Sequence, residues 1–123
     1  MEGRERVAIQ LVRDTRTRPL PIGVRQVVQR TRHLLFASEP FEVVLQVCPD
    51  ASDERLQLMG EVLSQGTPVS AAAVRLTGPL SPVEQVTDGE GEFWLEALPK
   101  GGYAIEVDTA NHVIEIPALS LAE

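Results

Sequence analysis

Few residues of this chain have the types and spacing that catalysis requires. His33 and His112 are the only histidines, and a zinc site would need further ligands converging on them. Acyl transfer by a Ser-His-acid triad needs a serine held against a histidine, and no serine of this chain stands in a nucleophile-elbow sequence. Cys48 is the only cysteine, which excludes an intramolecular disulfide and a cysteine cluster for zinc. We therefore expect no enzyme activity, no metal and no cofactor.

One turn gathers acidic residues, namely Asp88, Glu90 and Glu92. Their carboxylates and the neighbouring glycine carbonyls are oxygen ligands of the kind that calcium prefers. The full series of oxygen donors that a calcium loop needs is missing. We expect a solvated hairpin tip here, and we interpret Asp50, Asp53 and Glu54 in the same way.

Arginines concentrate at the start of the chain. Residues 1–33 hold eight arginines against three acids, a net charge of +5, whereas residues 34–123 hold three cations against fifteen acids, a net charge of −12. The candidate partner-binding residues are Arg16, Arg18, Arg25, Arg30 and Arg32. Arginine binds phosphates or acidic protein surfaces. No aromatic residue alternates with these arginines, and the overall charge of −7 repels nucleic acid, so a protein with an acidic surface is the favoured partner. Two alternatives stay open: a nucleic-acid-associated regulator, and packing of the basic stretch on the acidic part of its own chain.

The arginines are expected to lie on a helix. After a strand at 7–12 and a linker at 14–21 with two prolines, the apolar residues of 23–36 recur at helical spacing. This spacing predicts an amphipathic helix whose polar face carries Arg25, Arg30 and Arg32.

The rest of the chain predicts short strands separated by turns. Residues 41–48 alternate apolar and polar side chains, residues 50–54 form a polar turn, and residues 55–63 alternate again, which predicts a hairpin. Further strands are expected at 72–76, 83–87, 92–98, 103–108 and 113–116. Strands at this spacing indicate a sandwich or barrel.

The segment from about 56 to 119 resembles the carboxypeptidase-regulatory-like family of β-sandwich domains, also called transthyretin-like or carbohydrate-binding-like. The matching residues are Gly60, Val62, Gly66, Pro68, Val69, Ala73, Val74, Leu76, Thr87, Asp88, Gly91, Phe93, Leu95, Leu98, Gly101, Gly102, Tyr103, Ile105 and Val107. The resemblance implies an Ig-like antiparallel sandwich at 55–123. The preceding 1–54 would form a leader, with a strand, a proline linker, a basic helix and a strand, packed on that sandwich.

The single tryptophan, Trp94, is the other candidate site. Phe93 and Leu95 share the face expected to point into the core, so Trp94 should point outward. It would then either pack against the apolar stripe of the leader helix, which we favour, or form a platform for a sugar ligand.

The resulting hypothesis is a non-catalytic protein-interaction or regulatory module of bacterial type. The alternatives are a carbohydrate-binding module using Trp94 and the nucleic-acid regulator. No apolar run approaches the roughly 18 residues of a membrane span, and the opening residues 1–6 are not followed by the apolar h-region of a signal sequence. A cytoplasmic location is therefore expected, and removal of a signal sequence is left open. The oligomeric state is left open.

Overall fold

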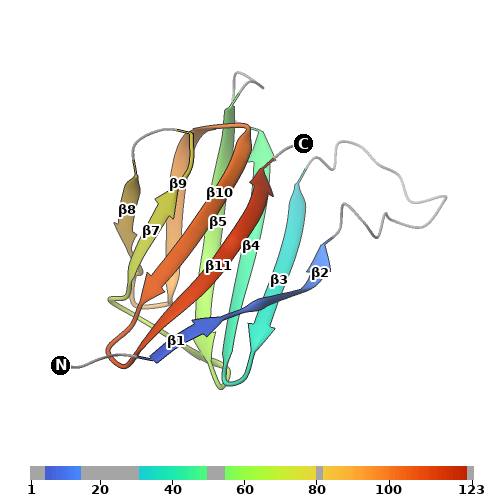
Figure 1. Ribbon diagram of the computed structural model, residues 1–123. Helices are drawn as coiled ribbons and strands as arrows, with labels where there is room; N and C mark the ends of the chain where they lie inside the picture. Colours follow the sequence, from blue (N-terminus) through green and yellow to red (C-terminus); the bar gives the residue numbers. More distant parts are fainter. Residues whose placement is uncertain (1–4, 15–30, 50–54, 80–81, 122–123) are drawn as a thin grey trace.

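A computed structural model of the protein describes residues 5–14, 31–49, 55–79 and 82–121. These residues form two mostly antiparallel sheets that share one core (Figure 1). Sheet A has the strand order β1 (Glu5–Ala8), β11 (His112–Leu121), β10 (Gly101–Asp108), β7 (Ala73–Thr77) and β8 (Val83–Val86). Sheet B has the order β2 (Gln10–Asp14), β3 (Arg32–Ser38), β4 (Phe41–Pro49), β5 (Arg55–Ser64) and β6 (Thr67–Pro68), and β9 (Glu92–Pro99) also pairs with β5.

The predicted strands after residue 40 are confirmed. In β4 the apolar residues at every second position are buried, because successive side chains of a strand point to opposite faces. β4 and β5 pair along nine positions, from Phe41 with Ser64 to Pro49 with Leu56, as the predicted hairpin requires. The division predicted between residues 54 and 55 falls between these two paired strands.

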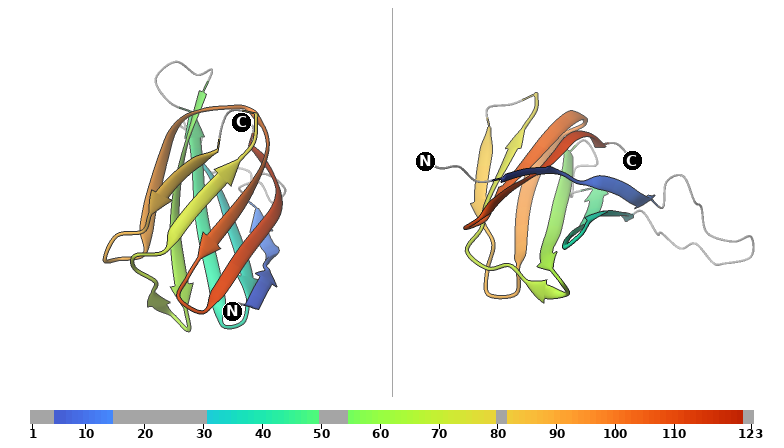
Figure 2. Two further views of the ribbon diagram at one scale, coloured as in Figure 1. Left: turned by 60° about the vertical axis from the view of Figure 1, so that its left-hand side comes forward. Right: turned by 60° about the horizontal axis from the view of Figure 1, so that its bottom comes forward.

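The predicted strand at 7–12 is divided between the two sheets. β1 pairs in parallel with β11 of sheet A, and β2 pairs with β3 of sheet B. Ile9, between them, is buried and donates its N–H to the Glu115 carbonyl at 2.9 Å. The segment thus connects one edge of each sheet, as the two views of Figure 2 show.

The predicted helix at 23–36 is wrong where the structure can test it. Residues 32–38 form β3, which pairs with β4 along seven positions. Leu34 and Phe36 are buried, a spacing of two that fits a strand. Pairing with the neighbouring strand overrides the helical spacing of the apolar residues, and Pro40 lies in the turn of a hairpin. Residues 23–30 lie outside the described part of the chain.

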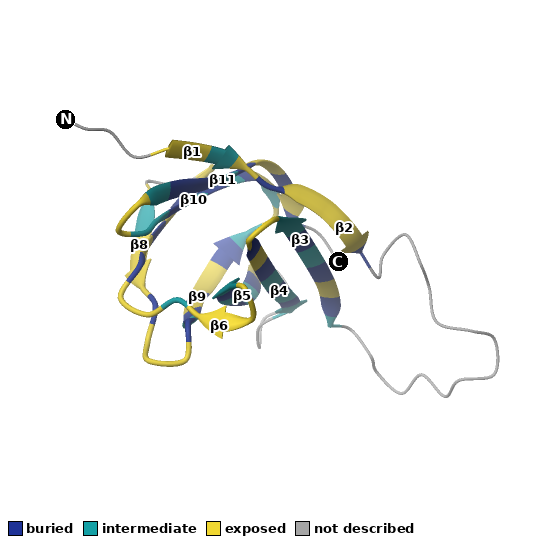
Figure 3. Cartoon of the chain, turned by 90° about the horizontal axis from the view of Figure 1, so that it is seen from below, coloured by how far each residue is buried: buried dark blue, intermediate teal, exposed yellow. Residues whose placement is uncertain are grey.

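The core lies between the sheets, as the burial colours of Figure 3 show. Phe93 of β9 is its largest fully buried side chain. Its ring fits because Gly60, opposite it on β5, has no side chain: a Cβ there would lie 2.2 Å from Phe93 Cζ. Tyr103 is buried as well, as predicted, and its hydroxyl donates to the Pro99 carbonyl at 2.5 Å. No helix in the described residues is long and apolar enough to cross a membrane.

Candidate functional site

The outer faces of the two sheets differ in chemistry. On sheet A, charged side chains of neighbouring strands pair with each other. Arg6 donates from Nη2 to Glu106 at 2.7 Å and from Nε to Glu115 at 2.8 Å. Arg75 Nε lies 4.0 Å from a Glu84 carboxylate oxygen. Each of these three glutamates therefore has an arginine beside it, as on an ordinary solvated surface.

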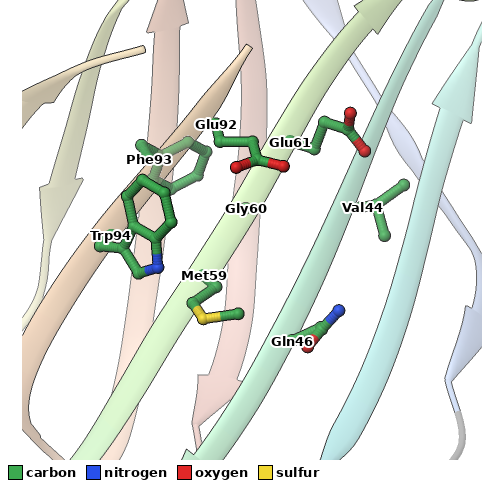
Figure 4. Close-up of a pocket in the computed structure, with 8 residues that line it drawn as sticks. All are labelled: Val44, Gln46, Met59, Gly60, Glu61, Glu92, Phe93 and Trp94. Carbon is green, nitrogen blue, oxygen red and sulfur yellow. The ribbon is translucent and has the colours of Figure 1, made fainter. Parts of the chain in front are cut away.

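The outer face of sheet B instead carries a small hollow around Trp94 (Figure 4). We call this hollow the Trp94 face. It has a volume of about 90 Å³ and is lined by Val44, Gln46, Met59, Gly60, Glu61, Glu92, Phe93 and Trp94. Its outward side chains come from three adjacent strands, β4, β5 and β9. A face built on paired strands holds these side chains at fixed positions.

Strand register explains why these residues meet. Met59 is opposite Trp94, and Glu61 is opposite Glu92, across the β5–β9 pair. Gln46 is opposite Met59 across the β4–β5 pair. Directly opposite side chains in antiparallel strands lie about 4.5–5.5 Å apart at Cβ, so each pair is in contact range.

Trp94 faces outward, as the alternation predicts. Phe93 is buried in the core, whereas Trp94 is 46% exposed. It is therefore the largest exposed apolar side chain among the described residues. The fit of the Phe93 ring against Gly60 fixes β9 in place, and this contact holds the indole on the opposite side of the strand.

In the part of the chain that the structure describes, the two carboxylates of the Trp94 face have no cation beside them. The pKa of Glu92 is raised by its partial burial, and further by the negative charges of Asp88, Glu90 and Glu61. Within the described ranges, no arginine, lysine or histidine nitrogen lies within 4 Å of the Glu61 or Glu92 carboxylate. The hollow thus combines an aromatic surface, a thioether, an amide and two like charges.

In the acidic turn next to this face, Asp88 and Gly91 stabilise the conformation of the turn itself. Asp88 accepts hydrogen bonds at Oδ1 from the N–H groups of Glu90 and Glu92, at 2.9 and 3.0 Å. Gly91 has a φ of +74°, and a Cβ there would lie 2.6 Å from the Val62 carbonyl oxygen, so glycine is required. A group of three or more potential metal ligands is found nowhere in the described residues.

Arg32 does not lie on an exposed face, contrary to the prediction. It is 8% exposed and forms a double hydrogen bond with buried Asp14, from Nε to Oδ1 at 2.9 Å and from Nη2 to Oδ2 at 2.7 Å. Its Nη1 donates to the Ser120 carbonyl at 2.6 Å. Because Asp14 and Arg32 belong to sheet B and Ser120 to sheet A, this side chain joins the two sheets. Arg16, Arg18, Arg25 and Arg30 lie outside the described residues.

The two histidines are not brought together. His33 is on β3, opposite Gln46 of sheet B. His112 begins β11 of sheet A, where its ring packs edge-to-face on Phe41 with the centroids 4.9 Å apart. Its Nε2 also lies 3.8 Å from the Glu5 carboxylate.

A wider hollow, of about 600 Å³, lies between turns at one end of the sandwich. Phe41, Ala72 and His112 are among its lining residues. The Thr109 hydroxyl in its lining forms hydrogen bonds within its own turn. Its Oγ1 donates to the His112 carbonyl at 3.0 Å and accepts from the His112 N–H at 2.9 Å. Unlike the Trp94 face, this hollow has no large exposed aromatic side chain in its lining.

The outward direction of Trp94 was predicted from the sequence, whereas the residues around it were not. Val44, Gln46, Met59 and Glu61 are the outward positions of the predicted hairpin, so the alternation that placed Phe41 and Leu56 inward could have identified them. Met59 and Glu61 are opposite Trp94 and Glu92 of β9, which come more than thirty residues later in the chain, and no local signal gives this register.

Comparison with known proteins adds no relative. The chain matches no family model, no curated protein and no solved structure.

Proposed function

We propose that this protein is a non-catalytic binding module that docks a partner protein on the outer face of sheet B, with Trp94 at the centre of the contact. The difference between the two outer faces carries the proposal. On sheet A the outward glutamates lie beside Arg6 or Arg75. Sheet B instead exposes Trp94 beside half-buried apolar residues and two carboxylates that have no ion-pair partner among the described residues.

The composition of the Trp94 face is that of a protein interface. Tryptophan and methionine are enriched in interface cores, and tryptophan is among the commonest residues to dominate the binding energy. Trp94 and Met59 are opposite each other, and Val44 extends the apolar surface onto β4. A single sheet holds all three, so little conformational entropy is lost on binding.

Site-specific photo-crosslinking in the host cell tests this proposal. A photoreactive amino acid at Met59, on the Trp94 face, is compared with the same group at Arg75, on the outer face of sheet A. We expect a discrete protein adduct from position 59 that disappears when Trp94→Ala is added, and none from position 75. Equal adducts at both positions, or adducts that survive Trp94→Ala, would contradict the proposal.

A carbohydrate ligand is the second candidate. An exposed indole beside Gln46, Glu61 and Glu92 combines an apolar platform with groups that accept or donate hydrogen bonds to hydroxyls. A glycan array distinguishes the two candidates. Retention of a defined glycan that is lost with Trp94→Ala, without a protein adduct at Met59, would favour the sugar.

We also propose that the sandwich is of the carboxypeptidase-regulatory-like kind, acting in the cytoplasm of a bacterium. The support is the order of glycine and aromatic residues along its strands. Gly60 faces Phe93 across β5 and β9, and Gly91 stands at the tight turn before β9. The test is a comparison of strand orders. An experimental structure of an assigned family member that has the same order of glycine and aromatic residues should show the same strand order as this chain, and a different order would contradict the relationship.

A further inference from the structure

We infer that the Trp94 face binds a cationic side chain of the partner protein, an arginine, between the Trp94 ring and the carboxylates of Glu61 and Glu92. This inference rests on the proposed function, because it specifies the chemistry of the group that the proposed interface receives. The partner surface at this contact would then be basic and apolar.

Charge is the first argument. Glu61 and Glu92 are directly opposite on adjacent antiparallel strands, and like charges in this arrangement destabilise a sheet. Both side chains are partly buried, and in the part of the chain that the structure describes neither has an ion-pair partner. On sheet A the equivalent pair of opposite glutamates, Glu106 and Glu115, is bridged by Arg6. A bound cation would supply the charge that this side of the sandwich lacks.

The neighbouring side chains favour a guanidinium group. In Figure 4 the Glu92 carboxylate lies between the Trp94 ring and Glu61, and the Glu61 carboxylate extends toward β4. Tryptophan is the strongest aromatic partner for a cation above its face. A guanidinium is planar, so it can stack on the indole while its N–H groups reach both carboxylates, which a lysine ammonium does less well. Met59 offers an apolar surface to the methylene stem.

Nuclear magnetic resonance of the full chain tests the inference directly. Trp94 is the only tryptophan, so its indole N–H gives a single signal that reports on this face. The probes are N-acetylarginine methylamide and its neutral isostere, N-acetylcitrulline methylamide. We expect the arginine probe to shift the Trp94 indole signal and the amide signals of Glu61 and Glu92 saturably, less at high salt. The citrulline probe should cause little shift.

Three glutamine variants complete the experiment. Glu61→Gln and Glu92→Gln should each weaken binding of the arginine probe by about two- to fivefold, the range of one exposed ion pair. Glu84→Gln, on the outer face of sheet A, is the matched control and should leave binding unchanged. Folding of each variant is checked by its dispersed amide spectrum.

The outcomes separate this inference from the proposed function. Equal shifts with arginine and citrulline, or no effect of either variant, overturn the arginine assignment even if the crosslink at Met59 is found. A shift of the indole signal in the free protein on Arg25→Gln would assign the site to this chain's own arginines and overturn an external partner. A shift that depends on protein concentration without probe would assign it to a second copy of the chain. Specific arginine binding without a crosslinked protein would support the chemistry and contradict the docking proposal.

Discussion

The contact between Gly60 and Phe93 gives a prediction that can be worked from the structure. A Cβ at position 60 would lie 2.2 Å from Phe93 Cζ, 2.4 Å from Cε1 and 3.0 Å from Leu45 Cδ2. Normal carbon contacts are about 3.5–4.0 Å, so the ring would have to move by more than an ångström in a packed core. Overpacking costs about 1–3 kcal/mol, and restricting the unfolded chain returns at most about 1 kcal/mol. We expect Gly60→Ala to lower the free energy of unfolding by about 1–2 kcal/mol.

A double-mutant cycle isolates the cause. In a Phe93→Leu background the ring is gone, so Gly60→Ala should then cost less than about half as much, a coupling that contacting residues commonly show. Urea denaturation followed by far-ultraviolet circular dichroism gives the four free energies. The reasoning would be refuted if Gly60→Ala were neutral in the parent chain, or if its cost were the same in both backgrounds.

Two further predictions concern charged groups. Arg32→Met should lower the free energy of unfolding by about 3–5 kcal/mol, because the buried ion pair and double hydrogen bond between Arg32 and Asp14 are lost. Adding Asp14→Leu should recover much of the loss, since it removes the buried carboxylate as well. Urea midpoints measure both effects, and an equal loss in the single and double variants would contradict this reasoning. The pKa of Glu92 is higher in the folded protein than its ordinary value of 4.5. Protonated Glu92 therefore stabilises the fold below the pKa of the unfolded chain, and this stabilisation is lost as the pH rises through the pKa of the folded protein. Glu92→Gln should therefore raise the urea midpoint at neutral pH and have no such effect below about pH 4, where the parent side chain is protonated; a lower midpoint at neutral pH would show that the charge is stabilising.

Much of the strand pattern was accessible from the sequence because it is local. Alternation in 41–48 and 55–63 reflects one buried face, and turn residues separate the later strands. The helix prediction failed at 32–36 because three consecutive apolar residues, Leu34 to Phe36, fit either spacing. Only pairing with β4 decides between the two, and that pairing is a tertiary contact. The division of the first strand at Ile9 likewise depends on the position of β11, which comes last in the chain.

The candidate site was only partly predictable for the same reason. The outward direction of Trp94 follows from its neighbour Phe93 alone. The positions of Met59 opposite Trp94 and of Glu61 opposite Glu92 depend on a register between β5 and β9 that the sequence does not encode locally. Arg32 was placed on the polar face of the helix that the apolar spacing predicted, and the buried carboxylate of Asp14 that accepts its hydrogen bond lies eighteen residues earlier.

The proposed docking of a partner depends most on Trp94 being exposed to solvent in the free protein. Acrylamide quenching of the intrinsic fluorescence of the full chain measures it, since Trp94 is the only tryptophan and is 46% exposed. We expect red-shifted emission that acrylamide quenches efficiently, with protection appearing only when a partner is added. Blue-shifted emission that resists acrylamide in the isolated chain would contradict the account, because the face would then already be covered.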